Sequence, residues 1–128
     1  DNIMYLGARS LDSFEKELLK DAAVYTSEDI NTSIEDVLGS VAKFTDDRKH
    51  VHLSIDVDVL DPEVSPGTGV PESGGIGLES LCRLLEVIGR SRKVVSIDLV
   101  EYNRLLDKDA KSYECVRRIL NDIAKFVL

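Results

Sequence analysis

Residues 51–62 read Val-His-Leu-Ser-Ile-Asp-Val-Asp-Val-Leu-Asp-Pro. Apolar and polar residues alternate through this stretch, which predicts a β-strand over residues 50–57. Alternation would place Asp56 and Asp58 on one face at the carboxyl end of that strand, together with His52 and Ser54. Two neighbouring anions are costly unless something neutralises them, and carboxylate oxygens suit manganese or magnesium. The same pattern also fits two capping carboxylates that bind backbone amides of the following loop.

Outward from this strand, apolar residues recur with the periods of alternating strands and helices. We expect further strands over residues 3–6, 23–25 and 94–100, and helices from residues 10–13 to about 19–21 and over 33–44, 78–88 and 109–128. Ser33 and Asp36 have the spacing of a helix-capping box. The last helix should bury the side that carries Tyr113, Val116, Ile119, Leu120, Ile123 and Phe126 or Val127. This alternation predicts an α/β fold, with a parallel sheet between helical layers.

The composition excludes several classes of partner. Sixteen Lys and Arg residues against 24 Asp and Glu give a formal net charge of −8. Phosphate neutralisation needs a basic face, so neither nucleic acid nor an anionic membrane surface is an expected partner. Cys82 and Cys115 cannot make a disulfide framework, and we expect them to be partly buried in a reducing, cytoplasmic compartment.

Residues 60–77 form the longest segment without a regular period. All three prolines and five of the eight glycines of the chain lie in it. Irregular loops of this length are uncommon in compact domains and usually carry function. Ligands of open α/β sheets bind beyond the carboxyl ends of the strands, so the site is expected just after residues 6, 57 and 100.

Several motifs of the chain resemble the signature of the ureohydrolase family, which includes arginase, agmatinase and formimidoylglutamase. Ser-Ile-Asp-Val-Asp-Val-Leu-Asp-Pro at 54–62 is followed by Pro-Gly-Thr-Gly-Val-Pro-Glu-Ser-Gly-Gly at 66–75. Ser-Ile-Asp-Leu-Val-Glu-Tyr-Asn at 96–103 looks like the family's D-x-x-E-x-N, which ends the last core strand. Gly-Ala-Arg-Ser-Leu-Asp-Ser-Phe-Glu at 7–15 is similar to the arginase segment G-x-R-D-x-D-x-x-E. Together these motifs cover nearly the whole chain in family order.

The resemblance implies a hydrolase of guanidinium groups that uses a pair of Mn²⁺ ions bridged by a hydroxide. By position, Asp56 and Asp58 would be metal ligands, with Asp56 bridging the two ions. Glu101 would hold the substrate guanidinium, because a carboxylate accepts two hydrogen bonds from that planar group; otherwise it is a solvated strand-end glutamate. Asp12 and Glu15 would contact the α-amino group of the substrate, although Asp-x-x-Glu is also common helix-capping chemistry.

Some residues bear on the choice of substrate. Val70 stands where the family usually has a Thr near the guanidinium, and Arg104 stands where arginases usually have Pro. Arg104 could repel a cationic substrate or simply point to solvent. Asp12 and Glu15 favour arginine over agmatine, which lacks an α-amino acid head group. Residues 66–69 resemble the corresponding agmatinase segment at least as much as the arginase segment.

Two polar strand residues are expected to have structural roles. His52 lies below the carboxylates on the same predicted face, and we expect a buried, hydrogen-bonded histidine there instead of a ligand. Asp98 precedes Glu101 on the last strand and is expected to support it.

The chain lacks the G-D-H and D-A-H-x-D motifs that supply the family's other metal ligands. Residues 1–128 therefore resemble the C-terminal portion of an arginase-like catalytic domain, and the N-terminal half of the same protein is an expected partner. Ureohydrolases generally form trimers or hexamers, so a homo-oligomer is implied. Two carboxylates cannot hold a manganese pair tightly, so this chain by itself is expected to be inactive.

The function implied for the full-length protein is manganese-dependent hydrolysis of L-arginine to ornithine and urea. An alternative within the class is agmatinase, or another guanidino or formimino hydrolase. An alternative from another class is a pseudoenzyme or regulatory subunit, to which only Val70 and Arg104 point.

Overall fold

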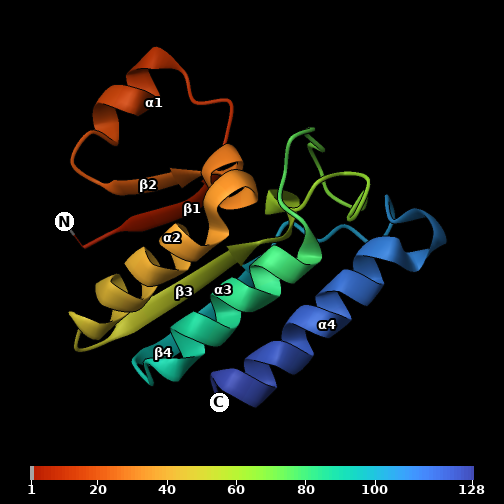
Figure 1. Cartoon of the computed structure of the whole chain (residues 1–128). Helices are drawn as coiled ribbons and strands as arrows, with labels where there is room; N and C mark the ends of the chain where they lie inside the picture. Colours follow the sequence, from red (N-terminus) through yellow and green to blue (C-terminus); the bar gives the residue numbers. More distant parts are fainter. Residues whose placement is uncertain (1) are drawn as a thin grey trace.

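Strands and helices alternate along the chain as its periodicity predicts (Figure 1). The computed structural model describes residues 2–128. Its strands are β1 (Met4–Ala8), β2 (Ala23–Thr26), β3 (Val51–Asp56) and β4 (Val94–Val100). Its helices are α1 (Ser13–Leu18), α2 (Ser27–Asp46), α3 (Leu78–Arg90) and α4 (Lys111–Phe126), with short 3₁₀ helices η1 (Val57–Val59) and η2 (Lys108–Ala110). Within this described range, no helix has the length and apolar character that crossing a bilayer requires.

The strands run parallel and hydrogen-bond in two pairs. β1 pairs with β2 and β3 pairs with β4, where the alternation predicts one continuous sheet. The two pairs meet at their carboxyl ends, where Gly7 lies so close to Val59 that a side chain at Gly7 would collide with it. In the second pair, Asp56 lies beside Val100. Because parallel strands end at the same edge, the residues that follow Asp56 and Val100 enter the same region.

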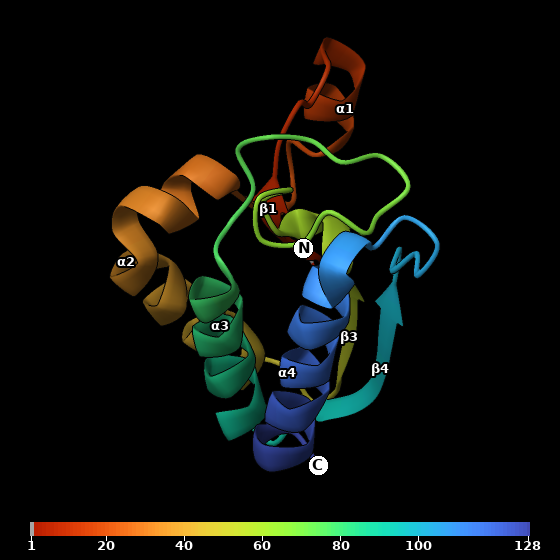
Figure 2. The ribbon, with the colours of Figure 1, turned by 90° about the vertical axis from the view of Figure 1, so that its right-hand side faces the viewer.

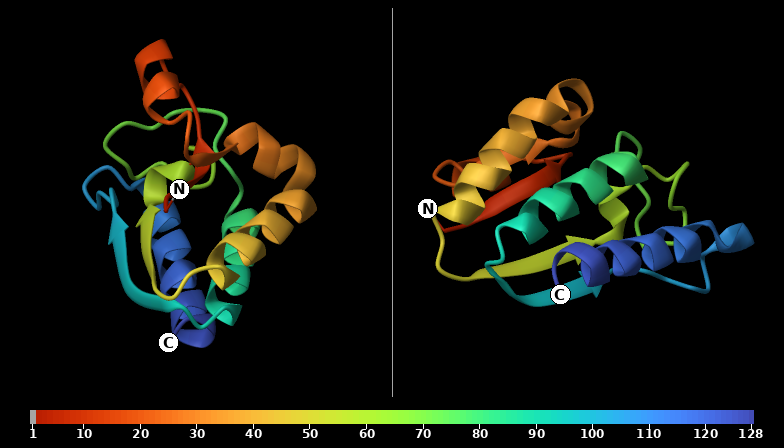
Figure 3. Two further views of the ribbon diagram at one scale, coloured as in Figure 1. Left: turned by 90° about the vertical axis from the view of Figure 1, so that its left-hand side faces the viewer. Right: turned by 60° about the horizontal axis from the view of Figure 1, so that its bottom comes forward.

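One face of the strands is covered by helices. α2, α3 and α4 lie side by side (Figure 2), and Figure 3 shows this layer from two other sides. The core between the layers is aliphatic and includes Ile55, Leu85, Ile88 and Ile119. Both cysteines are free and buried in this core, as the sequence predicts.

The other face of β3 and β4 is polar and exposed. His52 Nδ1 lies 2.7 Å from Ser96 Oγ, and His52 Nε2 lies 3.3 Å from Asp98 Oδ2. Ser54 donates to the same Asp98 carboxylate at 2.5 Å. The His52 side chain is 56% exposed, so the predicted burial is wrong although the hydrogen bonding is confirmed. His52 is exposed because the described helices pack only on the opposite face of the strands. Asp98, which is predicted to support Glu101, instead accepts a hydrogen bond from Ser54 on β3.

α2 begins at Ser27, earlier than the predicted start of the amphipathic helix, and its backbone is interrupted at Ser33, where that start is predicted. Thr26 and Asp29 form a complete capping box, in which the Asp29 amide donates to Thr26 Oγ1 at 3.1 Å and the Thr26 amide donates to Asp29 Oδ2 at 2.8 Å. Aspartate at this position closes the box as glutamate usually does. Ser33 instead has φ −141° and ψ 48°, outside the helical region, and marks a kink within α2.

α4 buries Ile119 and Ile123, as the sequence predicts, but two of the other residues predicted on the same side are exposed. Tyr113 and Leu120 are 49% and 51% exposed, so their predicted burial is wrong. The helix starts at Lys111 instead of Asp109, because Asp109 and Ala110 have φ of 60° and 55°. The buried stripe is Ser112, Cys115, Ile119, Asp122 and Ile123.

Asp122 is a buried carboxylate at the seam between α3 and α4. It is 7% exposed and accepts a hydrogen bond from Arg118 Nε at 3.1 Å. Burial alone would raise the pKa of Asp122, but hydrogen bonds from the Cys82 thiol and from Arg118 outweigh it and lower that pKa. Burial and the same carboxylate raise the pKa of the Cys82 thiol to about 12, so this thiol stays protonated and donates.

We expect Asp122→Asn to lower the free energy of unfolding by about 1–3 kcal/mol near neutral pH, because charged hydrogen bonds to a buried acceptor are lost. Since the folded-state pKa of Asp122 is lowered, its contribution is present above the unfolded-state value of about 3.9 and is lost as the pH falls through the folded-state pKa. Urea unfolding of both proteins at neutral and acid pH measures this difference.

The matched control is Glu79→Gln, because Glu79 lies 4.0 Å from the same Arg118 but is 79% exposed. This substitution should change stability by less than about 0.5 kcal/mol. An Asp122→Asn loss that is equally large in acid would contradict the assignment.

Candidate functional site

The two aspartates after β3 lie on different elements. The strand ends at Asp56, and Asp58 belongs to the 3₁₀ helix η1, so the prediction that both project from one strand face is wrong. The carboxylates nevertheless stay neighbours, because Asp56 Oδ1 accepts a hydrogen bond from the Asp58 amide at 3.0 Å. Asp56 therefore caps η1, as the alternative interpretation proposed. This bond uses the backbone amide of Asp58 and not its carboxylate.

The electrostatics of the pair favour a cation. Burial is the largest cause that raises the pKa of Asp58, and the charge of Asp56 raises it further. The guanidinium of Arg9 acts in the opposite direction. Oxygen donors of this kind fit Mn²⁺ or Mg²⁺. Across residues 2–128, however, no group of three or more His, Cys, Asp or Glu side chains could hold a metal, so these two carboxylates would supply only part of a metal site.

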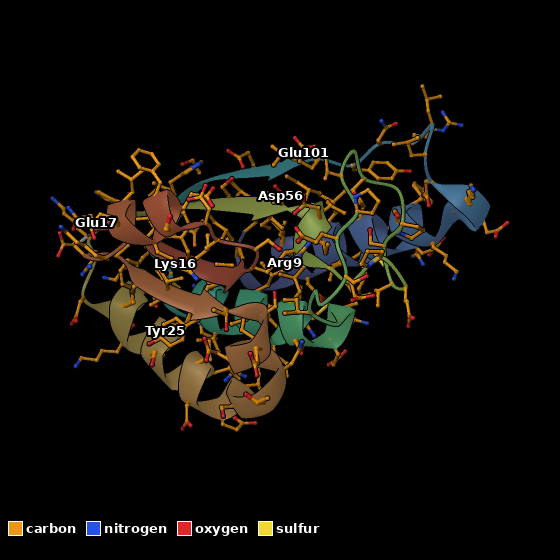
Figure 4. All side chains as sticks on the ribbon, turned by 90° about the horizontal axis from the view of Figure 1, so that it is seen from above. Arg9, Lys16, Glu17, Tyr25, Asp56 and Glu101 are labelled. Atoms are coloured by element: carbon orange, nitrogen blue, oxygen red, sulfur yellow. The ribbon has the colours of Figure 1, made fainter. Side chains whose placement is uncertain are left out.

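A cavity of about 370 Å³ lies beside this pair. Asp56 and Asp58 line it together with Arg9, Glu72 and the carboxyl-terminal half of β1. Seen from above in Figure 4, Arg9 lies next to the end of β3 that carries Asp56. The cavity is thus formed where the ends of β1 and β3 meet, which is the location predicted for a ligand.

Glu101 comes from the neighbouring strand end. It follows Val100, the β4 residue that pairs with Asp56, and Figure 4 shows Glu101 and Asp56 near each other. Its φ of 64° is in the left-handed region, which is uncommon for a residue with a side chain and turns the chain sharply out of β4. A Cβ on Gly69 would lie 3.7 Å from Glu101 Oε2, so the Gly/Pro-rich loop runs directly beside this carboxylate.

Asp61 closes the loop on itself. Its carboxylate accepts hydrogen bonds from the amides of Glu63 at 3.0 Å, Gly74 at 2.9 Å and Gly75 at 3.2 Å. These bonds, led by that from Glu63, lower the pKa of Asp61 despite its partial desolvation. Asp61 is not among the residues predicted for the site. The signal for its role is the Asp-Pro at the start of a glycine-rich loop, where aspartate commonly accepts hydrogen bonds from backbone amides.

Gly67 fastens the other part of the loop. Its amide donates to Ser112 Oγ at 2.6 Å, and its carbonyl accepts from the Asn103 amide at 2.8 Å. Asp107 lies so near that a Cβ on Gly67 would be 2.6 Å from Asp107 Cβ, so only glycine fits here. Asp107 itself accepts from the amides of Ser112 and Tyr113. The segment after Glu101, the loop and the start of α4 are thereby tied together.

Like Glu101, the other predicted site residues do not line the cavity. Asp12 caps α1 and forms a complete capping box with Glu15, whose Oε2 accepts from the Asp12 amide at 2.9 Å. Neither residue lines the cavity. Val70 is 75% exposed on the loop, and Arg104 is exposed beyond Glu101. The structure therefore brings Asp56, Asp58 and Glu101 to one edge but leaves the other candidates on the surface.

The sequence of the chain matches the Arginase family over residues 1–124. It is 37% identical to the arginase of Staphylococcus aureus (strain MRSA252) over 119 residues, which are 89% of this chain and 39% of that relative. It is 35% identical to the arginase of Entamoeba histolytica over 111 residues, which are 84% of this chain and 38% of that relative. The chain thus spans about two-fifths of the length of the curated relatives that it matches.

Solved structures lead to the same fold. The arginase from Bacillus subtilis superposes with a TM-score of 0.86 at 30% identity, over 94% of this chain and 43% of that chain. The agmatine ureohydrolase of Thermoplasma volcanium superposes with a TM-score of 0.81 at 26% identity, over 94% of this chain and 40% of that chain. The parallel strands and covering helices are therefore those of the arginase-like αβα fold, and this chain belongs to the arginase family.

Proposed function

We propose that this chain supplies the guanidinium-binding edge and two of the metal carboxylates of a ureohydrolase that hydrolyses L-arginine to ornithine and urea. The observation that carries the proposal is the convergence of Asp56, Asp58 and Glu101 at neighbouring carboxyl ends of β3 and β4. Membership of the arginase family supports the same reaction class.

The residues have distinct parts in this chemistry. Asp56 and Asp58 would hold manganese, which when bound lowers the pKa of water and makes hydroxide available near neutral pH. Glu101 would accept two hydrogen bonds from the planar guanidinium and thereby orient its carbon toward the carboxylates. The tied loop beside Glu101 limits the space around it, because Gly67 and Asp61 hold both parts of that loop.

The site needs further ligands from outside these residues. Two carboxylates do not complete a manganese pair, and in residues 2–128 no third ligand joins them. We therefore infer that the remaining part of an arginase-family fold is the partner of this chain, within one polypeptide or in an oligomer of trimer or hexamer type. By itself, the 128-residue chain should release no urea.

The direct test measures manganese-dependent urea release from L-arginine and agmatine. The protein purified as its source cell makes it should release urea, and the isolated 128-residue chain should not. Absence of release from the native protein with either substrate, at saturating manganese, would favour a pseudoenzyme. Faster turnover of agmatine would favour the agmatinase alternative. The fold similarity to the agmatine ureohydrolase of Thermoplasma volcanium is a reason to test it.

Glu101→Gln tests the guanidinium contact. The substitution keeps the shape but removes the charge, and we expect kcat/KM to fall about 100- to 1,000-fold, equivalent to about 3–4 kcal/mol. Manganese content should stay the same, because Glu101 is not a metal ligand in this proposal. Glu114→Gln, on the exposed side of α4, is the matched control and should leave both quantities unchanged.

Asp58→Asn tests the metal carboxylate. Loss of one anionic ligand should weaken manganese binding at least tenfold, measured by the signal of free Mn²⁺ in electron paramagnetic resonance. The exposed Asp36→Asn on α2 serves as the control. Equal manganese affinity in the Asp58 variant and the unmodified protein would remove Asp58 from the ligand set.

Asp12→Ser tests recognition of the substrate head group. Serine is as good a helix N-cap as aspartate, so this change preserves α1 while it removes the carboxylate. If Asp12 contacts the α-amino group, kcat/KM for L-arginine should fall about tenfold while the value for agmatine stays constant. A parallel loss with both substrates, or with neither, would assign Asp12 to capping alone, the role that its bonds to Phe14 and Glu15 display.

A further inference from the structure

We infer that Arg9 is a positioning residue, which holds η1 in place so that Asp58 faces the cavity. The inference rests on the proposed function, because it concerns how the metal carboxylates are held. Arg9 follows β1, whereas Asp58 follows β3, and these strands belong to separately hydrogen-bonded pairs. A link between them at this point decides how the two carboxyl ends lie relative to each other.

The guanidinium of Arg9 reaches the backbone of η1. Nη1 donates to the carbonyl of Val59 at 3.3 Å, and Nη2 donates to the carbonyl of Asp58. The remaining donor, Nε, is buried without a hydrogen-bond partner among the described residues. Nη1 and Nη2 thus donate to two consecutive carbonyls of the turn that carries Asp58.

The fork of Arg9 suits this contact for a geometric reason. Two consecutive carbonyls present two acceptors at fixed spacing, and a planar guanidinium offers two donors that are rigid with respect to each other. Lysine would bring a similar charge but no such fork. The contact thus fixes orientation as well as distance, which is what a ligand-bearing turn needs.

Two hydrogen bonds near Arg9 hold the end of β1 against neighbouring elements. The carbonyl of Gly7 accepts a hydrogen bond from Ser27 Oγ at 3.0 Å, so β1 is fastened to the first residue of α2. Ser10, just after Arg9, donates to the carboxylate of Glu72 in the loop across the cavity. We call Gly7, Arg9 and Ser10 the β1 clamp. It joins α2, η1 and the loop around the predicted metal carboxylates.

The experiment compares Arg9→Met and Arg9→Lys with the unmodified protein in its native form. Hydrogen exchange in metal-free protein is read at the amides of Asp58 and Leu60, which bond to Asp56 Oδ1 at 3.0 Å and to the Val57 carbonyl at 3.2 Å. We expect exchange at these amides to become about tenfold faster in Arg9→Met and less so in Arg9→Lys, while exchange in α3 stays constant. Manganese should bind about 10- to 100-fold more weakly to Arg9→Met, with partial rescue in Arg9→Lys.

Arg117→Met is the matched control, because Arg117 pairs with Glu114 on the exposed side of α4, away from the cavity. Unchanged exchange at Asp58 and Leu60 in Arg9→Met would overturn the inference. Faster exchange with unchanged manganese affinity would also overturn it, because Arg9 would then be structural only. If the unmodified protein binds no manganese and releases no urea, the proposed function fails, and the exchange result alone decides whether Arg9 holds η1.

Discussion

The carboxylate of Asp61 is the constraint on which the arrangement of the site depends. This carboxylate accepts hydrogen bonds from backbone amides at both ends of an irregular loop. Each of these amides would otherwise need water or another acceptor. Once the loop is closed in this way, Gly67 can bind Ser112 and Asn103 on its other side. The loop therefore connects the ends of β3 and β4 with the start of α4, and the catalytic candidates occupy the edge between them.

Charge placement explains why these strand ends suit a reaction and not a core. Asp56 and Asp58 lie half-buried beside each other, and burial, together with the charge of Asp56, raises the pKa of Asp58. Arg9 offsets part of this cost through its charge, and a bound cation would offset more. Glu101 stands at the next strand end in a left-handed backbone conformation, which a structure tolerates where surrounding contacts determine it and a function requires it.

The differences between sequence and structure have specific physical causes. His52 satisfies the pattern of a buried strand residue, but its face of the sheet receives no described helix and stays exposed. Tyr113 and Leu120 fit the same helical period as the buried Ile119 and Ile123, yet α4 buries Ser112 and Asp122 instead of them. Ser33 has a plausible capping box, but Thr26 and Asp29 form one earlier. For His52, Tyr113 and Leu120 the local pattern does not specify which face other elements cover, and at Ser33 a second capping box competes with the first.

The sequence by itself determined the alternation of strands and helices, the irregular loop after β3 and the motifs that identify the arginase family. These follow from local periodicity and from residue types at fixed spacing, which need no knowledge of distant contacts. Only the tertiary structure decided that Asp61 also binds the amides of Gly74 and Gly75, that Gly67 fastens the loop to Ser112, and that Arg9 reaches across from β1. These contacts join atoms far apart in the chain that meet only after folding, so no local pattern contains them.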